Sequence, residues 1–181
     1  MLTSRRLRSS RAVAGAVASL LAGLLAIALS LGYTALPEQA LVRRVIDGDT
    51  VKLGDGRLVR YIGVDAPELW RKIGGQWVED PEPFGQAAKD ANVTLVEGKT
   101  VRLEYDVETH DRYGRLLAYV YVDGTMINAA LLAGGYAQQM TIPPNVKHIE
   151  EFRRLVQEAR DAKRGLWSAP RPRRRRARDR P

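Results

Sequence analysis

Four of the acidic residues and one arginine in a single short stretch, from Val45 to Glu68, are candidates for chemistry. They are Asp47, Asp49, Arg60, Asp65 and Glu68. Between them, Gly54-Asp55-Gly56 separates two short apolar runs and predicts a hairpin. The hairpin brings one acidic pair, Asp47 and Asp49, and the other, Asp65 and Glu68, to the same end of a strand pair. Carboxylates held together repel one another unless a cation separates them, and a hard divalent cation prefers such oxygen ligands. The stretch therefore predicts a metal site.

The composition argues against other kinds of metal site. The 181-residue chain has no cysteine, so neither a disulfide framework nor a thiolate site can form. It has two histidines, His110 and His148, which do not favour a zinc site built on imidazole. We expect His110 in an exposed loop and His148 at the start of a helix.

The formal net charge of +8 comes from the two ends of the chain. Residues 1–37 carry four arginines and no acidic residue, and residues 171–181 carry seven arginines and Asp179. Residues 41–170 carry 18 Lys and Arg against 19 Asp and Glu, so nucleic-acid binding there must depend on particular arginines. The tail, residues 171–181, is predicted to be disordered; it either binds anionic polymers or is a solvated end without a dedicated role.

Residues 1–40 are predicted to be a targeting segment and linker. Arginines up to Arg11 precede an uncharged run of 22 residues, Ala12 to Tyr33. A signal-peptide core has about 7–15 residues and a spanning helix about 20, so the length favours a membrane anchor, while the alanine and glycine content leaves cleavage open. The positive-inside rule places the remainder outside the cytoplasm, so we expect an exported protein, either anchored or secreted.

Residues 41–170 are predicted to form one α+β domain. Five strands are expected at 41–46, 50–53, 57–64, 100–105 and 116–122, and three helices at 84–96, 126–132 and 148–163. This order fits a five-stranded OB-fold β-barrel with about three helices, preceded by the N-terminal hydrophobic helix. Residues 69–83 contain two tryptophans, Gly74-Gly75 and an acidic, proline-containing end, and we expect a long surface loop beside the site.

Two sequence blocks resemble the staphylococcal nuclease (thermonuclease) family. The first is I-D-G-D-T-V at 46–51 followed by R-Y-I-G-V-D-A-P-E at 60–68, and the second is D-R-Y-G-R at 111–115 followed by L-L-A-Y-V-Y-V-D-G-T-M-I-N. The blocks stand in the family's order, and the resemblance covers residues 42–167. It implies a Ca²⁺-dependent enzyme that hydrolyses DNA, and by extension RNA, with little sequence preference and leaves 3′-phosphates.

The resemblance implies a metal site built from the first block. Asp49 and Asp65 are the expected Ca²⁺ ligands, and the backbone carbonyl of Ala66 is the third. Asp47 is expected to act through water. Ligation by a backbone carbonyl tolerates any side chain, so an alanine at position 66 suits this role.

The same resemblance implies roles in catalysis and substrate binding. Glu68 is expected to orient or deprotonate the attacking water. Arg60 and Arg115 are expected to hold the scissile phosphate, because a planar guanidinium donates paired hydrogen bonds to phosphate oxygens. Tyr113 is the candidate for a hydrogen bond to a terminal phosphate.

One segment departs from the family's pattern. Residues 140–145, M-T-I-P-P-N, contain no tyrosine where the family has aromatic residues that stack on a nucleotide base. Such stacking is worth about 1–3 kcal/mol per base, so we expect weaker substrate binding from this segment. Asn145, which the family keeps as an anchor, is present.

Three functional classes are compatible with these features. The first is a nuclease acting on single-stranded DNA or RNA, with a monomer as the default. The second is a nuclease-fold module that binds nucleic acid or a protein without cutting; the charged residues of both blocks favour the enzyme. The third is a membrane-surface protein whose arginine-rich tail contacts acidic polymers and whose domain is a spacer.

Overall fold

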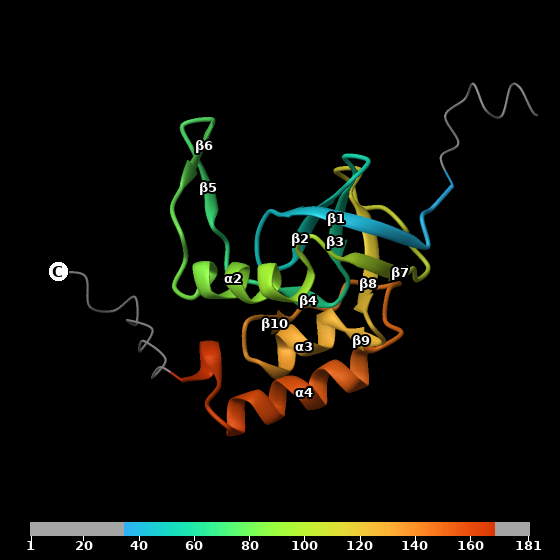
Figure 1. Cartoon of the computed structure of the whole chain (residues 1–181). Helices are drawn as coiled ribbons and strands as arrows, with labels where there is room; N and C mark the ends of the chain where they lie inside the picture. The colour runs from blue at the N-terminus through green and yellow to red at the C-terminus, as the bar shows by residue number, and fades with distance from the viewer. Residues whose placement is uncertain (1–34, 169–181) are drawn as a thin grey trace, which may run out of the picture. The chain divides into compact units, whose positions relative to one another are not determined.

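Five strands form a closed β-barrel. The computed structural model describes residues 35–168, apart from the side chains of Lys72 and Trp77. The barrel strands are β1 (Gln39–Val45), β2 (Thr50–Leu53), β3 (Leu58–Tyr61), β7 (Thr100–Glu104) and β8 (Leu116–Val122). They pair in the order β3-β2-β1-β7-β8, and a parallel pairing of β3 with β8 closes the ring (Figure 1). The predicted five-stranded OB-type barrel is confirmed.

The barrel follows from alternation of apolar and polar residues along its strands. Val51 and Leu53 of β2 are fully buried, and Lys52 between them is exposed. In β3, Val59 and Tyr61 are buried in the same way. Successive side chains of a strand point to opposite faces, so the apolar set of each strand fills the barrel interior.

Three helices cover part of the barrel. They are α2 (Gly85–Val96), α3 (Ile127–Ala133) and α4 (Ile149–Asp161), and a short 3₁₀ helix, Gly165–Trp167, follows α4. Figure 1 shows α3 and α4 side by side beneath the barrel, and α2 beside the hairpin and β1. Phe152, Val156 and Ala159 form the buried stripe of α4. The three predicted helices are confirmed, with bounds that differ by up to two residues.

The prediction of a loop at residues 69–83 is wrong for most of this segment. Trp70–Ile73 (β5) and Gln76–Glu79 (β6) form a two-stranded hairpin that projects from the barrel (Figure 1). Gly74 and Gly75, both with positive φ, make the two-residue turn that such hairpins favour. The acidic, proline-containing residues suggested a loop, but they lie after the hairpin.

Short strands complete the arrangement near the predicted site. The expected strand at 57–64 ends at Tyr61, and Val64–Asp65 forms a separate strand, β4, paired with β10 (Gln138–Gln139). β9 (Thr125–Met126) extends the sheet beyond β8. The side-chain amide of Asn128 links the segment between β3 and β4 to β8. Its nitrogen donates to Ile62 O at 2.9 Å, and its oxygen accepts from Val120 N–H at 2.9 Å.

The predicted N-terminal anchor and the arginine-rich tail lie outside the described residues. Within residues 35–168, no helix has the length and apolar character needed to cross a membrane.

Candidate active site

Arg60 lies between the two acidic groups of the first block. The register of β2 and β3 places Arg60 opposite Thr50, and therefore next to Asp49. Its guanidinium pairs with the Asp49 carboxylate and, at 3.1 Å, with Oδ1 of Asp65 in β4. The structure thus brings Asp49, Arg60 and Asp65 together, as the hairpin interpretation predicts.

Asp49 is a buried carboxylate with several partners. Its side chain is 1% exposed. The Ala66 backbone N–H donates to Oδ2 at 2.7 Å, and the Thr50 hydroxyl donates to Oδ1 at 3.2 Å. These contacts fix the carboxylate in place beside Arg60. Ala66 therefore reaches Asp49 through its N–H, and a metal-binding role for its carbonyl stays a prediction.

Asp47 and Glu68 add further negative charge around Arg60. Oδ1 of Asp47 accepts a hydrogen bond from the Asp49 N–H at 3.0 Å. Burial raises the pKa of Asp47, and the charge of Arg60 opposes this. Glu68 is exposed, yet partial burial of its carboxyl and the charge of Asp47 raise its pKa, again against Arg60. One guanidinium therefore faces more carboxylates than it can neutralise.

A close contact with α2 holds the turn between Asp47 and Asp49. A Cβ atom at Gly48 would lie 2.5 Å from the Ala66 Cβ and 2.8 Å from the Ala88 Cβ of α2, distances at which real atoms overlap. A glycine is needed here so that the helix and the turn can approach each other.

Asn92 of α2 is a buried polar residue that sequence reasoning missed. Its amide donates to Asp47 O at 3.1 Å, and its oxygen accepts from the Tyr61 hydroxyl at 3.0 Å. Asn92 thus links the acidic turn to β3. The available signal was an asparagine on the same helical face as the buried residues Ala88 and Val96, where an unpaired amide would be costly.

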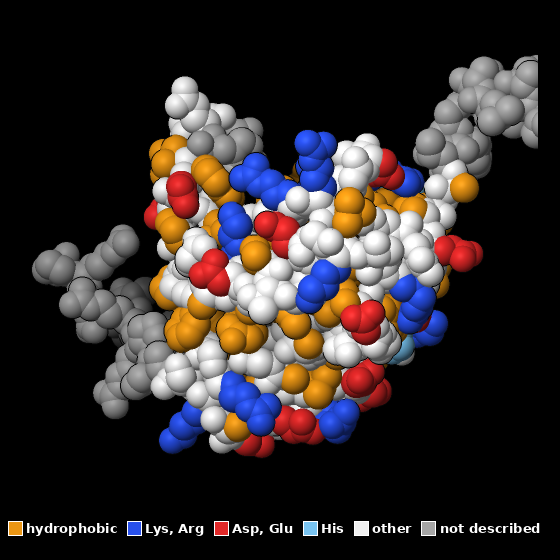
Figure 2. Space-filling model, viewed as in Figure 1, with side chains coloured by type: hydrophobic (Ala, Val, Ile, Leu, Met, Phe, Trp, Pro, Cys, Tyr) orange, Lys and Arg blue, Asp and Glu red, His pale blue; other side chains and the backbone are white. Residues whose placement is uncertain are grey.

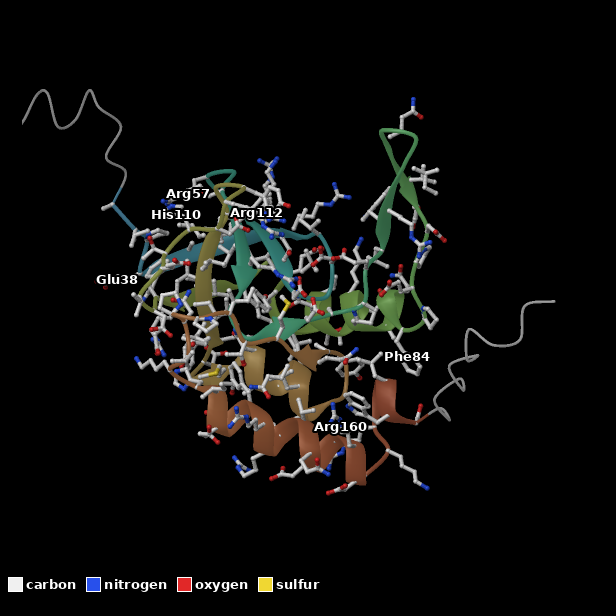
Figure 3. All side chains as sticks on the ribbon, turned by 180° about the vertical axis from the view of Figure 1, so that it is seen from behind. Glu38, Arg57, Phe84, His110, Arg112 and Arg160 are labelled. Carbon is white, nitrogen blue, oxygen red and sulfur yellow. The ribbon has the colours of Figure 1, made fainter. Side chains whose placement is uncertain are left out.

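Arg60 also lines a cleft of about 770 Å³. Tyr113 and Arg115, from the segment before β8, line this cleft with Arg60. His110 and Arg112 of the same segment line it too, and Figure 3 shows both at the same end of the barrel as Arg57. Asp49 and Glu68 are not among the described residues that line the cleft. Arg60 is therefore shared between the acidic cluster and the cleft.

Asp111 orients Arg115, a role that sequence reasoning did not assign. Its Oδ1 accepts the backbone N–H groups of Tyr113 and Arg115, each at 2.9 Å, and its Oδ2 accepts the Arg115 Nε–H at 2.7 Å. Burial works against ionisation, but the hydrogen bonds from Arg115 hold the pKa of Asp111 below its ordinary value. Because Asp111 takes only Nε, the terminal nitrogens of Arg115 remain available to a phosphate. The aspartate-to-glycine turn pattern at 111–114 was the signal.

Tyr113 is 69% exposed at the cleft, and its hydroxyl accepts a hydrogen bond from Arg112 at 2.7 Å. Its predicted contact with a terminal phosphate stays a prediction. Met140 and Ile142 form another part of the cleft wall. Asn145 anchors this wall, since its side chain exchanges two hydrogen bonds of 2.8 Å with the backbone of Glu108.

The donor set around Arg60 suits a hard divalent cation, because it consists of carboxylates with no imidazole or thiolate. Within residues 35–168, however, no three such side chains are arranged as a ready metal site. In this arrangement the Arg60 guanidinium supplies the positive charge between Asp49 and Asp65. The chemistry of the donors fits the predicted metal, and their assignment as ligands stays a proposal.

The fold and this site together define a nuclease-type OB barrel. A family model described as staphylococcal nuclease homologue matches residues 58–169, and the chain belongs to this family.

Individual proteins of the family are similar to this chain over most of its length. The chain is 42% identical over 130 residues to endonuclease YncB of Bacillus subtilis, covering 69% of this chain and 59% of that protein. It is 40% identical to SPbeta prophage-derived endonuclease YokF of the same organism, of which it covers 42%. It is 39% identical over 133 residues to a thermonuclease of Staphylococcus intermedius, covering 72% of this chain and 76% of that protein. The chain thus spans less than two thirds of the two Bacillus proteins.

Proposed function

We propose that this protein is a divalent-cation-dependent endonuclease, with Ca²⁺ as its cation. It hydrolyses phosphodiester bonds of single-stranded DNA, and of RNA, with little sequence preference, and leaves 3′-phosphates. The observation that carries this proposal is the position of Arg60, which pairs with Asp49 and Asp65 and also lines the cleft together with Arg115. The names of the relatives, endonuclease and thermonuclease, support the same activity.

Four groups of this chain would hold the cation: the carboxylates of Asp49 and Asp65, the backbone carbonyl of Ala66, and Asp47 through water. A bound divalent cation supplies positive charge beside the phosphate and lowers the pKa of a coordinated water. The charge surplus around Arg60 supports this assignment, since the carboxylates of Asp47, Asp49, Asp65 and Glu68 surround a single guanidinium.

Glu68 is the residue that takes the proton of the attacking water. It is exposed at the edge of the acidic cluster, so a water molecule can reach its carboxylate. Partial burial and the charge of Asp47 raise its pKa, which makes it a stronger base than an ordinary glutamate. A base of this kind contributes about 10²–10⁴-fold to a rate.

Arg60 and Arg115 bind the phosphate that is attacked. Its negative charge grows as the water adds, and preorganised guanidinium groups stabilise that charge without having to move. Asp111 fixes the orientation of Arg115, while the Tyr113 hydroxyl at the open side of the cleft donates to a terminal phosphate.

The cleft wall supports a weaker contact with the base than aromatic stacking gives. Met140 and Ile142 are aliphatic, and Ile142 is 60% exposed. A base packed on them gains apolar contact but not the about 1–3 kcal/mol of aromatic stacking. We expect a high KM and little preference among bases.

We further propose that the protein acts as a monomer outside the cytoplasm. The basic segment up to Arg11 and the apolar run from Ala12 to Tyr33 support export. An uncleaved run would hold the protein at the membrane, and a cleaved run would release it.

Digestion of single-stranded DNA tests the activity. The purified full chain is incubated with Ca²⁺ or with EGTA, beside Glu68→Gln and Arg115→Ala. We expect Ca²⁺-dependent cutting that falls by about 10²-fold or more in each variant. A urea unfolding curve for each variant shows that the loss is not a loss of folding.

The possible outcomes separate the functional classes. Cutting that survives both substitutions would show that the catalytic residues are assigned incorrectly. A folded wild type that binds DNA without cutting it would contradict the nuclease and support a nucleic-acid-binding module. If activity required only residues 171–181 and tolerated Glu68→Gln, the arginine-rich tail would be the functional part.

A further inference from the structure

Two basic side chains lie at directly opposite positions of β1 and β2. The register pairs Arg44 with Lys52, and both residues are exposed. The next pair, Val45 and Val51, is buried, so Arg44 and Lys52 point outward on one face of the sheet. Like charges at directly opposite positions repel one another and destabilise a strand pair. Their presence here needs a compensating reason.

No acidic residue of the described part of the chain pairs with either of these side chains. Among residues 35–168, neither Arg44 nor Lys52 forms an ion pair or a side-chain hydrogen bond. By contrast, Arg153 and Arg154 of α4 pair with Glu150 and Glu158 at 2.7 Å. The charges of Arg44 and Lys52 are therefore available to an anion from outside.

The same face leads to the candidate active site. Lys52 lies opposite Leu58, and Thr50 lies opposite Arg60, so Arg60 is the diagonal neighbour of Lys52 on that face. Diagonal neighbours of an antiparallel pair are about 7–8 Å apart. Figure 2 shows Lys and Arg side chains gathered over β1 and β2, beside the projecting β5–β6 hairpin. Arg44, Lys52 and Arg60 form one line across three strands.

We propose that Arg44 and Lys52 bind the phosphates of a single-stranded nucleic acid next to the phosphate held by Arg60. This inference rests on the proposed function and extends its substrate site onto the outer face of β1 and β2. Residues 41–170 have nearly equal numbers of acidic and basic residues, so local charge and not net charge must attract the strand. The contacts go to phosphate, so they add affinity without sequence preference.

Binding of a labelled oligothymidylate of about 16 nucleotides tests the proposal. Fluorescence anisotropy is measured with the full chain in EGTA, which prevents cutting, over a range of salt concentrations. The test variant is Arg44→Gln with Lys52→Gln. The control is Arg153→Gln with Lys163→Gln, which removes the same charge from α4 and the residues that follow it, the region of Arg160 in Figure 3.

We expect the test variant to bind roughly tenfold more weakly at low salt. The slope of log K against log salt should shrink by about 1.4, because each phosphate contact to a single strand contributes about 0.7. The control should retain the wild-type slope. The urea midpoint of the control should change little, and that of the test variant should rise slightly because the repulsion between Arg44 and Lys52 is removed, so weaker binding would not reflect a loss of folding.

Two results would overturn the inference. One is an unchanged slope in the test variant, and the other is an equal loss in test and control, which would mean that the strand responds only to net charge. Cutting by the wild type in Ca²⁺ is measured in parallel. An active wild type with an unchanged slope in the test variant removes this inference alone, whereas a wild type that never cuts removes the proposed function.

Discussion

Two charge clusters of the same barrel have opposite compositions. At β7, one carboxylate, Glu104, is surrounded by positive and hydrogen-donating groups: Lys147 at 2.8 Å, His148 at 3.0 Å and the Tyr121 hydroxyl at 3.0 Å. At β3, one guanidinium, Arg60, is surrounded by the carboxylates of Asp47, Asp49, Asp65 and Glu68.

The pKa values follow these compositions. Burial opposes ionisation of Glu104, but hydrogen bonds from Lys147, His148 and Tyr121 lower its pKa to about 2. At the other cluster, burial raises the pKa of Asp47 and of Glu68. The first cluster is satisfied within the chain and joins β7 to the start of α4. The second retains surplus negative charge, which is the property that a cation site requires.

Removing the base should have the largest effect on activity and none on the fold. In Glu68→Gln we expect the cutting rate to fall by about 10²–10⁴-fold, because an amide cannot accept the proton of the water. Glu68 is exposed, so the free energy of unfolding should change by less than about 0.5 kcal/mol. Single-turnover kinetics and urea unfolding measure the two quantities.

The matched control for this prediction is Glu104→Gln, the same substitution in the satisfied cluster. It should keep the wild-type cutting rate per folded molecule. If Glu104→Gln lost activity as severely as Glu68→Gln, the division between a structural and a functional cluster would be wrong.

A smaller effect is expected from the residue that orients Arg115. Asp111→Asn keeps an oxygen for the backbone N–H groups but loses the charged acceptor for Nε, so Arg115 should sample other orientations. We expect kcat/KM to fall roughly 10- to 100-fold. In an Arg115→Ala background the same substitution should cost almost nothing more, because both changes remove one interaction. Full additivity of the two losses would contradict a positioning role.

Stability should respond most to the satisfied cluster. Glu104→Gln should lower the free energy of unfolding by about 1–3 kcal/mol at pH 7, since Lys147, His148 and Tyr121 then have a neutral acceptor in place of a charged one. The Glu104 pKa is about 2 in the folded chain and 4.5 ordinarily, so its contribution is present above pH 4.5 and is lost as the pH falls toward 2. The variant should show a flatter decline of stability over that range, measured by urea unfolding.

The control for stability is Glu150→Gln on α4. Glu150 is 77% exposed and pairs with Arg153 at the surface, where an ion pair is worth about 0–1 kcal/mol. A loss at Glu150 as large as that at Glu104 would mean that the Glu104 cluster is not special.

Most of the barrel could be predicted because its strands show their pattern locally. The run at 116–122 matches β8 residue for residue. The β5–β6 hairpin was missed although Gly74-Gly75 is a turn signal, because the acidic, proline-containing residues that follow it drew the whole segment into a loop. The short pairing of β4 with β10 and its register could not be predicted, because neither segment alone contains a pattern that specifies them.

The acidic cluster could be predicted for a similar reason: one hairpin brings Asp49 and Arg60 together within a few residues of Asp65. The residues that hold it in place could not. Asn92 and Gly48 act through contacts between α2 and the turn, and these exist only once the helix packs on the barrel. The unpaired charges of Arg44 and Lys52 likewise become visible only through strand register.

The most direct test is whether Ca²⁺ stabilises the folded chain, and which of the two clusters that stabilisation requires. Unfolding by urea is measured with and without Ca²⁺ for the wild type, Asp65→Asn and Glu104→Gln. A cation at about 100 times its Kd stabilises the folded state by about 2.7 kcal/mol. We expect that increment in the wild type and in Glu104→Gln, and its loss in Asp65→Asn. An increment that Asp65→Asn retains in full, or that the wild type lacks, would contradict a cation site in the carboxylates around Arg60.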